Sequence, residues 1–286
     1  MRISPLAALT LALTLAGCGG SEQPTKLWEA TGFKEPESAA IDPLDGVIYV
    51  SNVAGSPVDR DGNGYISKLT LDGKVTAAEW VTGLDSPKGV LLIDDRLYVA
   101  DLDNLVEIDT TTGTIAARHA APGAKILNGI SADSEGRIYV SDWTGNAIWR
   151  LADGTFEKWL ESDELKNPNG VLVDGDKLIV AAWGKAEADF STKVPGNLIA
   201  VSLADKTITS LGSKPVGNLD GIVAFDSGTY VVTDWVAGKV FKVTHAGDAT
   251  EYLSISQGTA DLDYDAASHL AVIPVMASNK VVAYKF

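Results

Sequence analysis

Short apolar runs recur along the chain at nearly regular intervals, and a turn-forming segment with one polar residue precedes each run. The clearest copy is Pro168-Asn169-Gly170-Val171-Leu172-Val173-Asp174. A second apolar run follows each copy, and these runs are Val47–Ser51, Leu97–Asp101, Ile138–Asp142, Leu178–Ala182, Tyr230–Asp234 and Leu270–Pro274. Short apolar runs bounded by turn signals predict β-strands, and no long helical periodicity is present after residue 17.

The polar residue in front of each unit gives the period of the repeat. It is found at Glu37, Lys88, Asn128, Asn169, Asp220 and Asp261, at intervals of 51, 40, 41, 51 and 41 residues. A period of about 40 residues with four short strands per unit is typical of a β-propeller. Six copies therefore predict an all-β, six-bladed β-propeller. The last unit ends at Phe286 after about three strands, so we expect Thr25–Thr31 to supply its fourth strand and close the ring.

Two intervals are about ten residues longer than the others. The additional residues are Val53–Gly64 in the first unit and Gly184–Gly196 in the fourth. The first and fourth blades face each other across a six-membered ring, so we expect both insertions to flank one mouth of the central channel. Loops on a rigid scaffold are frequent sites of binding residues.

The first 25 residues have a different character. Residues 1–17 predict a signal peptide, because Arg2 precedes an apolar run, Pro5–Ala16, that is too short to span a bilayer. The run ends in Leu15-Ala16-Gly17-Cys18, which predicts a bacterial lipobox with Cys18 as the lipidated first residue. An ordinary cleaved signal with a chance cysteine is the alternative. Residues 18–25 then form the lipidated cysteine and tether, and residues 26–286 form the propeller.

Lipidation predicts a secreted protein that contacts the membrane only through its lipid anchor. In a Gram-negative host, Gly19 after the cysteine favours the periplasmic face of the outer membrane. The formal charge of −15 disfavours nucleic acid as a partner, because the chain would repel phosphate, although acidity can also serve solubility alone. Cys18 is the one cysteine of the chain, so disulfides do not stabilise it. The sequence indicates no protein partner.

The six repeated polar residues are expected to converge on the axis, since each lies where an innermost strand begins. Glu37 and Asp220 supply carboxylates, and Asn128 and Asn169 supply amide oxygens. This set suits Ca²⁺, or another divalent cation that prefers oxygen ligands, and it does not suit Zn²⁺ because it contains no His or Cys. Two alternatives remain: Asn-Gly and Asp-Gly are common turn dipeptides, and the acids can pair with Lys88 instead of a metal.

Other residues are expected at the same mouth. Trp143, Trp183 and Trp235 follow the second strands of three successive units, where they can form an aromatic wall for an apolar or ring-shaped ligand or simply pack between blades. Lys88 and Asp261 complete the predicted substrate pocket. Lys88 either contacts an anionic substrate or neutralises Glu37 and Asp261. The aspartates at one repeat position are expected to cap loop amides; they are Asp101, Asp142 and Asp234.

These motifs resemble those of the six-bladed propeller hydrolases that include regucalcin (the senescence marker protein), gluconolactonase and the luciferin-regenerating enzyme. The similar contexts are Pro36-Glu37-Ser38, Leu127-Asn128-Gly129, Pro168-Asn169-Gly170 and Leu219-Asp220-Gly221. The resemblance implies that these four polar residues bind calcium, that the protein hydrolyses an ester, lactone or phosphoester as its small-molecule substrate, and that Asp220 is a metal ligand and also a base or nucleophile.

Two departures from the family separate this chain from its sugar-lactone enzymes. Ile126 stands where those enzymes carry a substrate-binding arginine, and none of the three histidines is well placed for a base. A surface-tethered propeller without enzymatic activity, which binds a ligand or acts as a scaffold, is therefore the alternative function.

Overall fold

The structure is a computed structural model that describes residues 23–187 and 189–286. The predicted signal peptide at 1–17, the predicted lipidation site Cys18 and most of the tether at 18–25 lie outside the described residues. Within the described part of the chain, no helix is long and apolar enough to cross a membrane.

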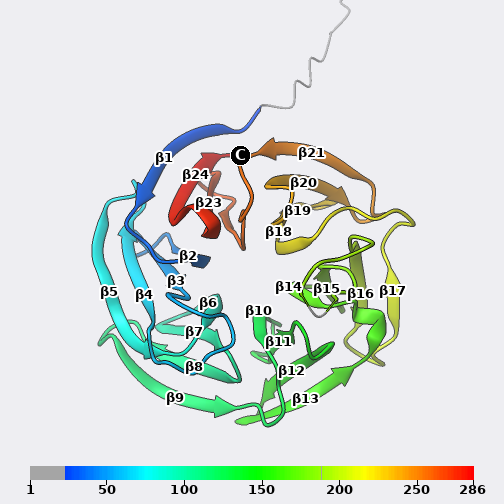
Figure 1. The fold of residues 1–286 in the computed structure, drawn as a ribbon, viewed down its shortest axis with the longest axis horizontal. Helices are drawn as coiled ribbons and strands as arrows, with labels where there is room; N and C mark the ends of the chain where they lie inside the picture. Colours follow the sequence, from blue (N-terminus) through cyan, green and yellow to red (C-terminus); the bar gives the residue numbers. More distant parts are fainter. Residues whose placement is uncertain (1–22, 188) are drawn as a thin grey trace, which may run out of the picture.

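Six four-stranded antiparallel sheets surround a central axis, which confirms the predicted six-bladed propeller (Figure 1). Blades one to three follow the chain from the inside outwards. Their strands are β2 (Pro36–Asp42), β3 (Val47–Asn52), β4 (Gly64–Thr70) and β5 (Val75–Leu84); β6 (Pro87–Ile93), β7 (Arg96–Asp101), β8 (Asn104–Asp109) and β9 (Thr114–Ala120); and β10 (Leu127–Ala132), β11 (Ile138–Asp142), β12 (Ala147–Ala152) and β13 (Thr155–Glu161).

Blades four to six repeat this order, except that the last blade combines both ends of the chain. Their strands are β14 (Pro168–Asp174), β15 (Lys177–Ala182), β16 (Leu198–Ser202) and β17 (Ile208–Ser210); β18 (Leu219–Asp226), β19 (Thr229–Asp234), β20 (Lys239–Thr244) and β21 (Ala249–Ser254); and β22 (Asp263–Asp265), β23 (Leu270–Val275), β24 (Lys280–Lys285) and β1 (Thr25–Thr31). Two short 3₁₀ turns, η1 (Asp163–Leu165) and η2 (Met276–Ser278), connect strands.

The N-terminal strand closes the ring, as the strand count predicted. β1 runs antiparallel to β24, with Glu29 opposite Val282 and Thr31 opposite Lys280. In Figure 1 β1 and the C-terminus lie together in this blade. The pairing removes an exposed edge from β24, and it buries Ala30 in an apolar cluster with Val281.

The apolar core lies between adjacent blades rather than inside any one of them. One cluster joins Tyr139 and Trp159 of blade three to Val171 and Val180 of blade four. Tyr139 and Trp159 pack edge to face, with ring centroids 5.3 Å apart. Since a single sheet cannot bury its own faces, each blade depends on both of its neighbours for stability.

In the first five blades, the repeated polar residues lie inside the innermost strands and not in the turns before them. The third innermost strand, β10, starts at Leu127, so that the repeated polar residue Asn128 and the following Gly129 are both part of the strand. The pairing with the second strand is irregular at this point in each of the first five blades. The irregular steps are Pro36 to Ala39, Pro87 to Val90, Leu127 to Ile130, Pro168 to Val171 and Leu219 to Ile222. Such bulges redirect a side chain out of the ladder.

The glycines of these bulges are required by close approach between neighbouring inner strands. A Cβ on Gly170 would lie 2.3 Å from the carbonyl oxygen of Asp220, and one on Gly129 would lie 2.6 Å from the carbonyl oxygen of Asn169. Neither glycine has a positive φ angle. The Asn-Gly and Asp-Gly pairs are therefore not turn dipeptides here, and turn geometry does not account for their polar residues.

Candidate metal and substrate site

Five of the six repeated polar residues meet at one cavity on the axis. The cavity has a volume of about 460 Å³, and its lining includes Glu37, Lys88, Asn128, Asn169 and Asp220. Each is the second residue of an innermost strand and comes from a different blade. All five are buried, with at most 6% of their surface exposed. The ring closure thus brings together side chains that are up to 183 residues apart in sequence.

Three of the four predicted metal ligands have a buried oxygen without a hydrogen-bond partner. These atoms are Glu37 Oε2, Asn169 Oδ1 and Asp220 Oδ1. Buried polar atoms without partners are uncommon in native proteins, and each one costs free energy. Three such oxygens from three blades at one cavity are what a site for a hard cation presents in the absence of the ion.

The electrostatics of the two carboxyl groups also favour a cation. Burial raises the pKa of Glu37 well above its usual value, and the charges of Asp220 and Asp261 raise it further. Burial and the charge of Asp261 raise the pKa of Asp220 in the same way, whereas a hydrogen bond from Asn169 lowers it. Two ionised carboxylates at this depth need a compensating positive charge.

Acids alone do not form a metal centre in this fold. Across residues 23–187 and 189–286, no group of three or more His, Cys, Asp or Glu side chains is placed to hold a metal ion. The candidate site therefore depends on the two amide oxygens as well as on the two acids. That composition lacks the His and Cys ligands that zinc prefers and suits calcium, which accepts neutral oxygen ligands.

Lys88 lines the cavity, but its ammonium group is held by neighbours on the rim. It donates to Ser86 Oγ at 2.6 Å and to the carbonyl oxygens of Ser86 and Pro57 at 3.2 and 3.3 Å. Among the described residues it makes no ion pair. Burial lowers the pKa of Lys88 to about 8, although the charge of Glu37 opposes this shift. Lys88 therefore does not pair directly with Glu37 or Asp261.

Asp261 does not belong to this cavity, which corrects the expectation that all six residues share one rim. It precedes β22 and lies outside the regular strand. Its carboxylate accepts from Ser38 Oγ at 2.7 Å and from its neighbour's amide, Leu262 N–H, at 2.8 Å. It lines a second cavity, of about 240 Å³, between the inner strands. Ser38 replaces the bulge glycine of blades two to five, and its hydroxyl binds the Asp261 carboxylate, which lines the second cavity.

This placement gives a pH-dependent prediction for Asp261→Asn. Burial raises the pKa of Asp261 from 3.8 to about 6, so the folded chain holds this proton more tightly than the unfolded chain. The resulting stabilisation is present at low pH and is lost as the pH rises through about 6. Wild type should therefore lose up to about 3 kcal/mol relative to Asp261→Asn between about pH 4 and pH 7. Urea unfolding of both proteins in chelator measures this difference, and parallel pH profiles would contradict it.

The three predicted tryptophans form a continuous aromatic wall on the cavity. Trp143 and Trp183 pack edge to face with centroids 5.3 Å apart, and Trp183 lies 6.1 Å from Trp235. The structure therefore combines the two alternatives, since the rings pack between blades and also line the cavity. The indole N–H groups of Trp143 and Trp183 are buried donors without an acceptor.

Both insertions reach the mouth of the cavity. Pro57 comes from the first insertion, and Phe190 comes from the second. Phe190 lies over Trp143 with a centroid distance of 5.2 Å and extends the aromatic wall. The sequence located both loops but not these side chains. Val236 and Met276, from the corresponding loops of blades five and six, also line the cavity. The one sequence signal that could have identified them is their position after the second strand of a repeat.

The aspartates at the ends of the second strands have the structural role predicted for them. Asp101 accepts from the amides of Asp85 and Ser86, at 2.7 to 3.1 Å. Asp142 and Asp234 accept loop amides in the same way. Asp142 and Asp234 directly precede Trp143 and Trp235, so they fix the connections from which these two tryptophans project.

The histidines lie away from the cavity, as expected. Tyr230 stacks on His245, His119 bonds to Glu107 at 2.5 Å, and His269 lies 3.3 Å from the Tyr264 hydroxyl. A histidine base is therefore not part of this site.

Comparison with solved structures identifies the fold. A gluconolactonase from Xanthomonas campestris matches with a TM-score of 0.69 at 16% identity, covering 92% of this chain and 89% of the other. A putative gluconolactonase matches with a TM-score of 0.69 at 17% identity, covering 93% and 92% of the two chains. The chain has the gluconolactonase-like propeller fold. Virginiamycin B lyase from Staphylococcus aureus shares it with a TM-score of 0.63 at 16% identity, over 92% of this chain and all of that one. No protein-family model and no curated protein matches the sequence.

Proposed function

We propose that this protein is a calcium-dependent hydrolase of an ester, lactone or phosphoester, with its metal site on the propeller axis. The observation that carries the proposal is the set of three unpartnered, buried oxygens, on Glu37, Asn169 and Asp220, at one cavity. A structural role would leave such atoms paired with protein donors. Gluconolactonases are among the proteins that share this fold, which supports lactone or ester chemistry.

Glu37, Asn128, Asn169 and Asp220 would hold the ion. When bound, calcium supplies a Lewis acid that polarises a carbonyl or phosphoryl oxygen. The chain's own residues perform the other tasks. The aromatic wall positions the substrate and limits access of water, while Asn169 orients Asp220 through its hydrogen bond. Asp220 is the group that moves a proton or attacks the substrate, because no histidine lines the cavity.

The lining of the cavity defines the body of the substrate. Four aromatic rings, those of Trp143, Trp183, Phe190 and Trp235, line the cavity together with its polar residues. Ile126, where sugar-lactone enzymes carry arginine, is buried and supplies no charge. An apolar or aromatic acyl group fits this wall better than a polyhydroxylated sugar acid.

We further propose that Cys18 anchors the protein by lipid, on the periplasmic face of the outer membrane in a Gram-negative host. The support is the lipobox Leu15-Ala16-Gly17-Cys18 alone. In this arrangement the propeller meets the membrane only through its tether, and its substrate is a small molecule of the extracytoplasmic space.

The alternative function is ligand binding without turnover by the same cavity. The observation that favours it is the absence of a histidine base, together with the low basicity of a carboxylate that binds a metal. In that case the metal would fix the ligand and the aromatic wall would select it.

One experiment separates the two functions. Purified protein is analysed for bound metal and then assayed against 4-nitrophenyl esters, aliphatic lactones and phosphotriesters, with calcium and with chelator. The hydrolase proposal predicts turnover that is lost in chelator and returns with calcium. Metal binding without any turnover would refute it and would support the binding module.

A further inference from the structure

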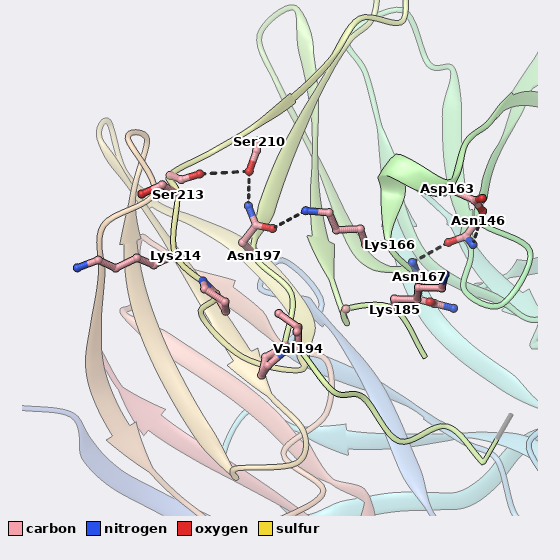
Figure 2. A pocket seen from close by; sticks show the side chains of 14 residues that line it. Asn146, Asp163, Lys166, Asn167, Lys185, Val194, Asn197, Ser210, Ser213 and Lys214 are labelled. Atoms are coloured by element: carbon pink, nitrogen blue, oxygen red, sulfur yellow. Dashed lines mark hydrogen bonds between the residues drawn. The ribbon is translucent and has the colours of Figure 1, made fainter. Parts of the chain in front are cut away.

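A second, larger pocket lies outside the ring of inner strands, at the boundary of blades three and four (Figure 2). Its volume is about 530 Å³. The turn η1, the second insertion and the loop between β17 and β18 enclose it, and the buried side chains of Asn167 and Asn197 form part of its wall. The candidate catalytic site does not use it.

A shallow groove connects this pocket with the central cavity. The groove has a volume of about 500 Å³ and shares Phe190 with the cavity. It shares Asn146, Asn167 and Lys185 with the outer pocket. An elongated molecule can therefore extend from the aromatic wall, past Phe190, into the outer pocket. We call the groove and the outer pocket together the lysine groove.

Positive charge is concentrated in the lysine groove although the chain is strongly acidic. Its four lysines are all exposed, and among the described residues none of them forms an ion pair; they are Lys125, Lys166, Lys185 and Lys214. Only two carboxylates line it. Glu187 is already paired with Lys193 at 2.8 Å, and Asp163 accepts a hydrogen bond from Asn146 at 3.3 Å. Unpaired ammonium groups along a concave surface attract anions.

Lys166 occupies the left-handed C-cap position of η1, and its side chain lines the outer pocket. Lys166 has φ 55° and Asn167 has φ 59°, so two consecutive residues adopt the left-handed conformation. Asparagine tolerates this conformation, whereas lysine is strained there and glycine would fit freely. The Lys166 ammonium lies 3.5 Å from Asn197 Oδ1, on the wall of the pocket (Figure 2).

We propose that the lysine groove binds the anionic end, a carboxylate or a phosphate, of an elongated ligand whose apolar body lies against Trp143 and Phe190. The identification of this ligand as the substrate rests on the proposed function. The binding of the ligand in the lysine groove is independent of that function. The groove would then select amphipathic anions over neutral molecules of the same length.

Binding is tested on the full chain in chelator, so that no metal can coordinate the anion. The probes are decyl phosphate, decanoate and neutral decanol, and tryptophan fluorescence reports binding. Both anions should bind more tightly than decanol. Lys166→Gly and Lys185→Gln should each weaken anion binding by about tenfold, as expected for one hydrogen bond to a charged group, and leave decanol unaffected.

Two controls keep the test specific. Lys74→Gln removes an exposed lysine of blade one and should change nothing, so an equal loss in this variant would overturn the proposal in favour of a general charge effect. Lys166→Gly relieves the backbone strain, so its melting temperature should stay the same or rise while anion binding falls. Anions that bind no better than decanol would also overturn the proposal.

Turnover separates this inference from the proposed function. The probes are 4-nitrophenyl monoesters of dicarboxylic acids of increasing length, compared with their neutral methyl esters. Hydrolysis that does not depend on the terminal charge, at any length, would overturn the lysine groove and leave the hydrolase intact. Lysine-dependent binding of decyl phosphate without any turnover would support the groove and refute the hydrolase.

Discussion

Calcium removal is expected to lower the melting temperature of the protein by several degrees. In the metal-free protein, Glu37 and Asp220 are buried carboxyl groups with unpartnered oxygens; burial raises the pKa of both, and the charge of Asp220 raises that of Glu37 further. An ion that binds only the folded state, at a free concentration of about 100 times its Kd, adds about 2.7 kcal/mol to the free energy of unfolding. At roughly 2 °C or more per kcal/mol for a domain of this size, the shift is on the order of 5 °C or more. Thermal unfolding in calcium and in chelator measures it.

Glu37→Gln provides the matched variant for this measurement. Glutamine keeps the shape and one oxygen ligand but removes a buried charge, so the metal-free variant should be at least as stable as metal-free wild type. Calcium should also raise the melting temperature of Glu37→Gln much less than that of wild type. Glu135→Gln removes an acid whose side chain is 70% exposed and should respond to calcium as wild type does. If wild type melts at the same temperature in calcium and chelator, the metal site proposed here does not exist.

The repeat of polar residues was sufficient to predict the architecture, because period and strand count are local properties of the sequence. Closure of the ring by Thr25–Thr31 followed from the missing strand of the last unit, and β1 pairs with β24 as predicted. The placement of Asn128 and Asn169 on the axis followed from the same repeat. Symmetry converts equivalent sequence positions into neighbouring side chains, so a propeller reveals its axial residues unusually well.

What the sequence did not predict depends on contacts between blades. The bulge glycines resembled turn glycines, and only the approach of the neighbouring strand shows why Gly170 lacks a side chain. Asp261 looked equivalent to Asp220, but Ser38, from the blade across the closure, binds its carboxylate, which lines the second cavity. Lys88 looked like a counter-ion, yet its ammonium bonds to Ser86. The first two cases are decided by one residue of an adjacent blade, whereas Lys88 is held by Ser86, two residues earlier in the chain, and by Pro57 of the first blade.

The second large effect is expected at Asp220, whose replacement should abolish turnover. Asp220→Ala removes both a charged oxygen ligand and the group proposed to move the proton or attack, and it should reduce kcat/KM by about 10²–10⁴-fold for every ester or lactone that wild type hydrolyses. The buried carboxylate lies at the cavity floor and has no protein donor at Oδ1. Turnover that survives Asp220→Ala would exclude hydrolysis at this site.

Asp220→Asn separates the two roles of this residue. Asparagine retains a neutral oxygen that can bind calcium, as Asn128 and Asn169 are proposed to do, but it can neither accept a proton at neutral pH nor attack a carbonyl carbon. If Asp220 is only a ligand, excess calcium should restore turnover in Asp220→Asn as it restores the melting temperature. If Asp220 is the base or nucleophile, calcium should restore the melting temperature but not turnover. We expect the second result, because no histidine lines the cavity to take over the proton.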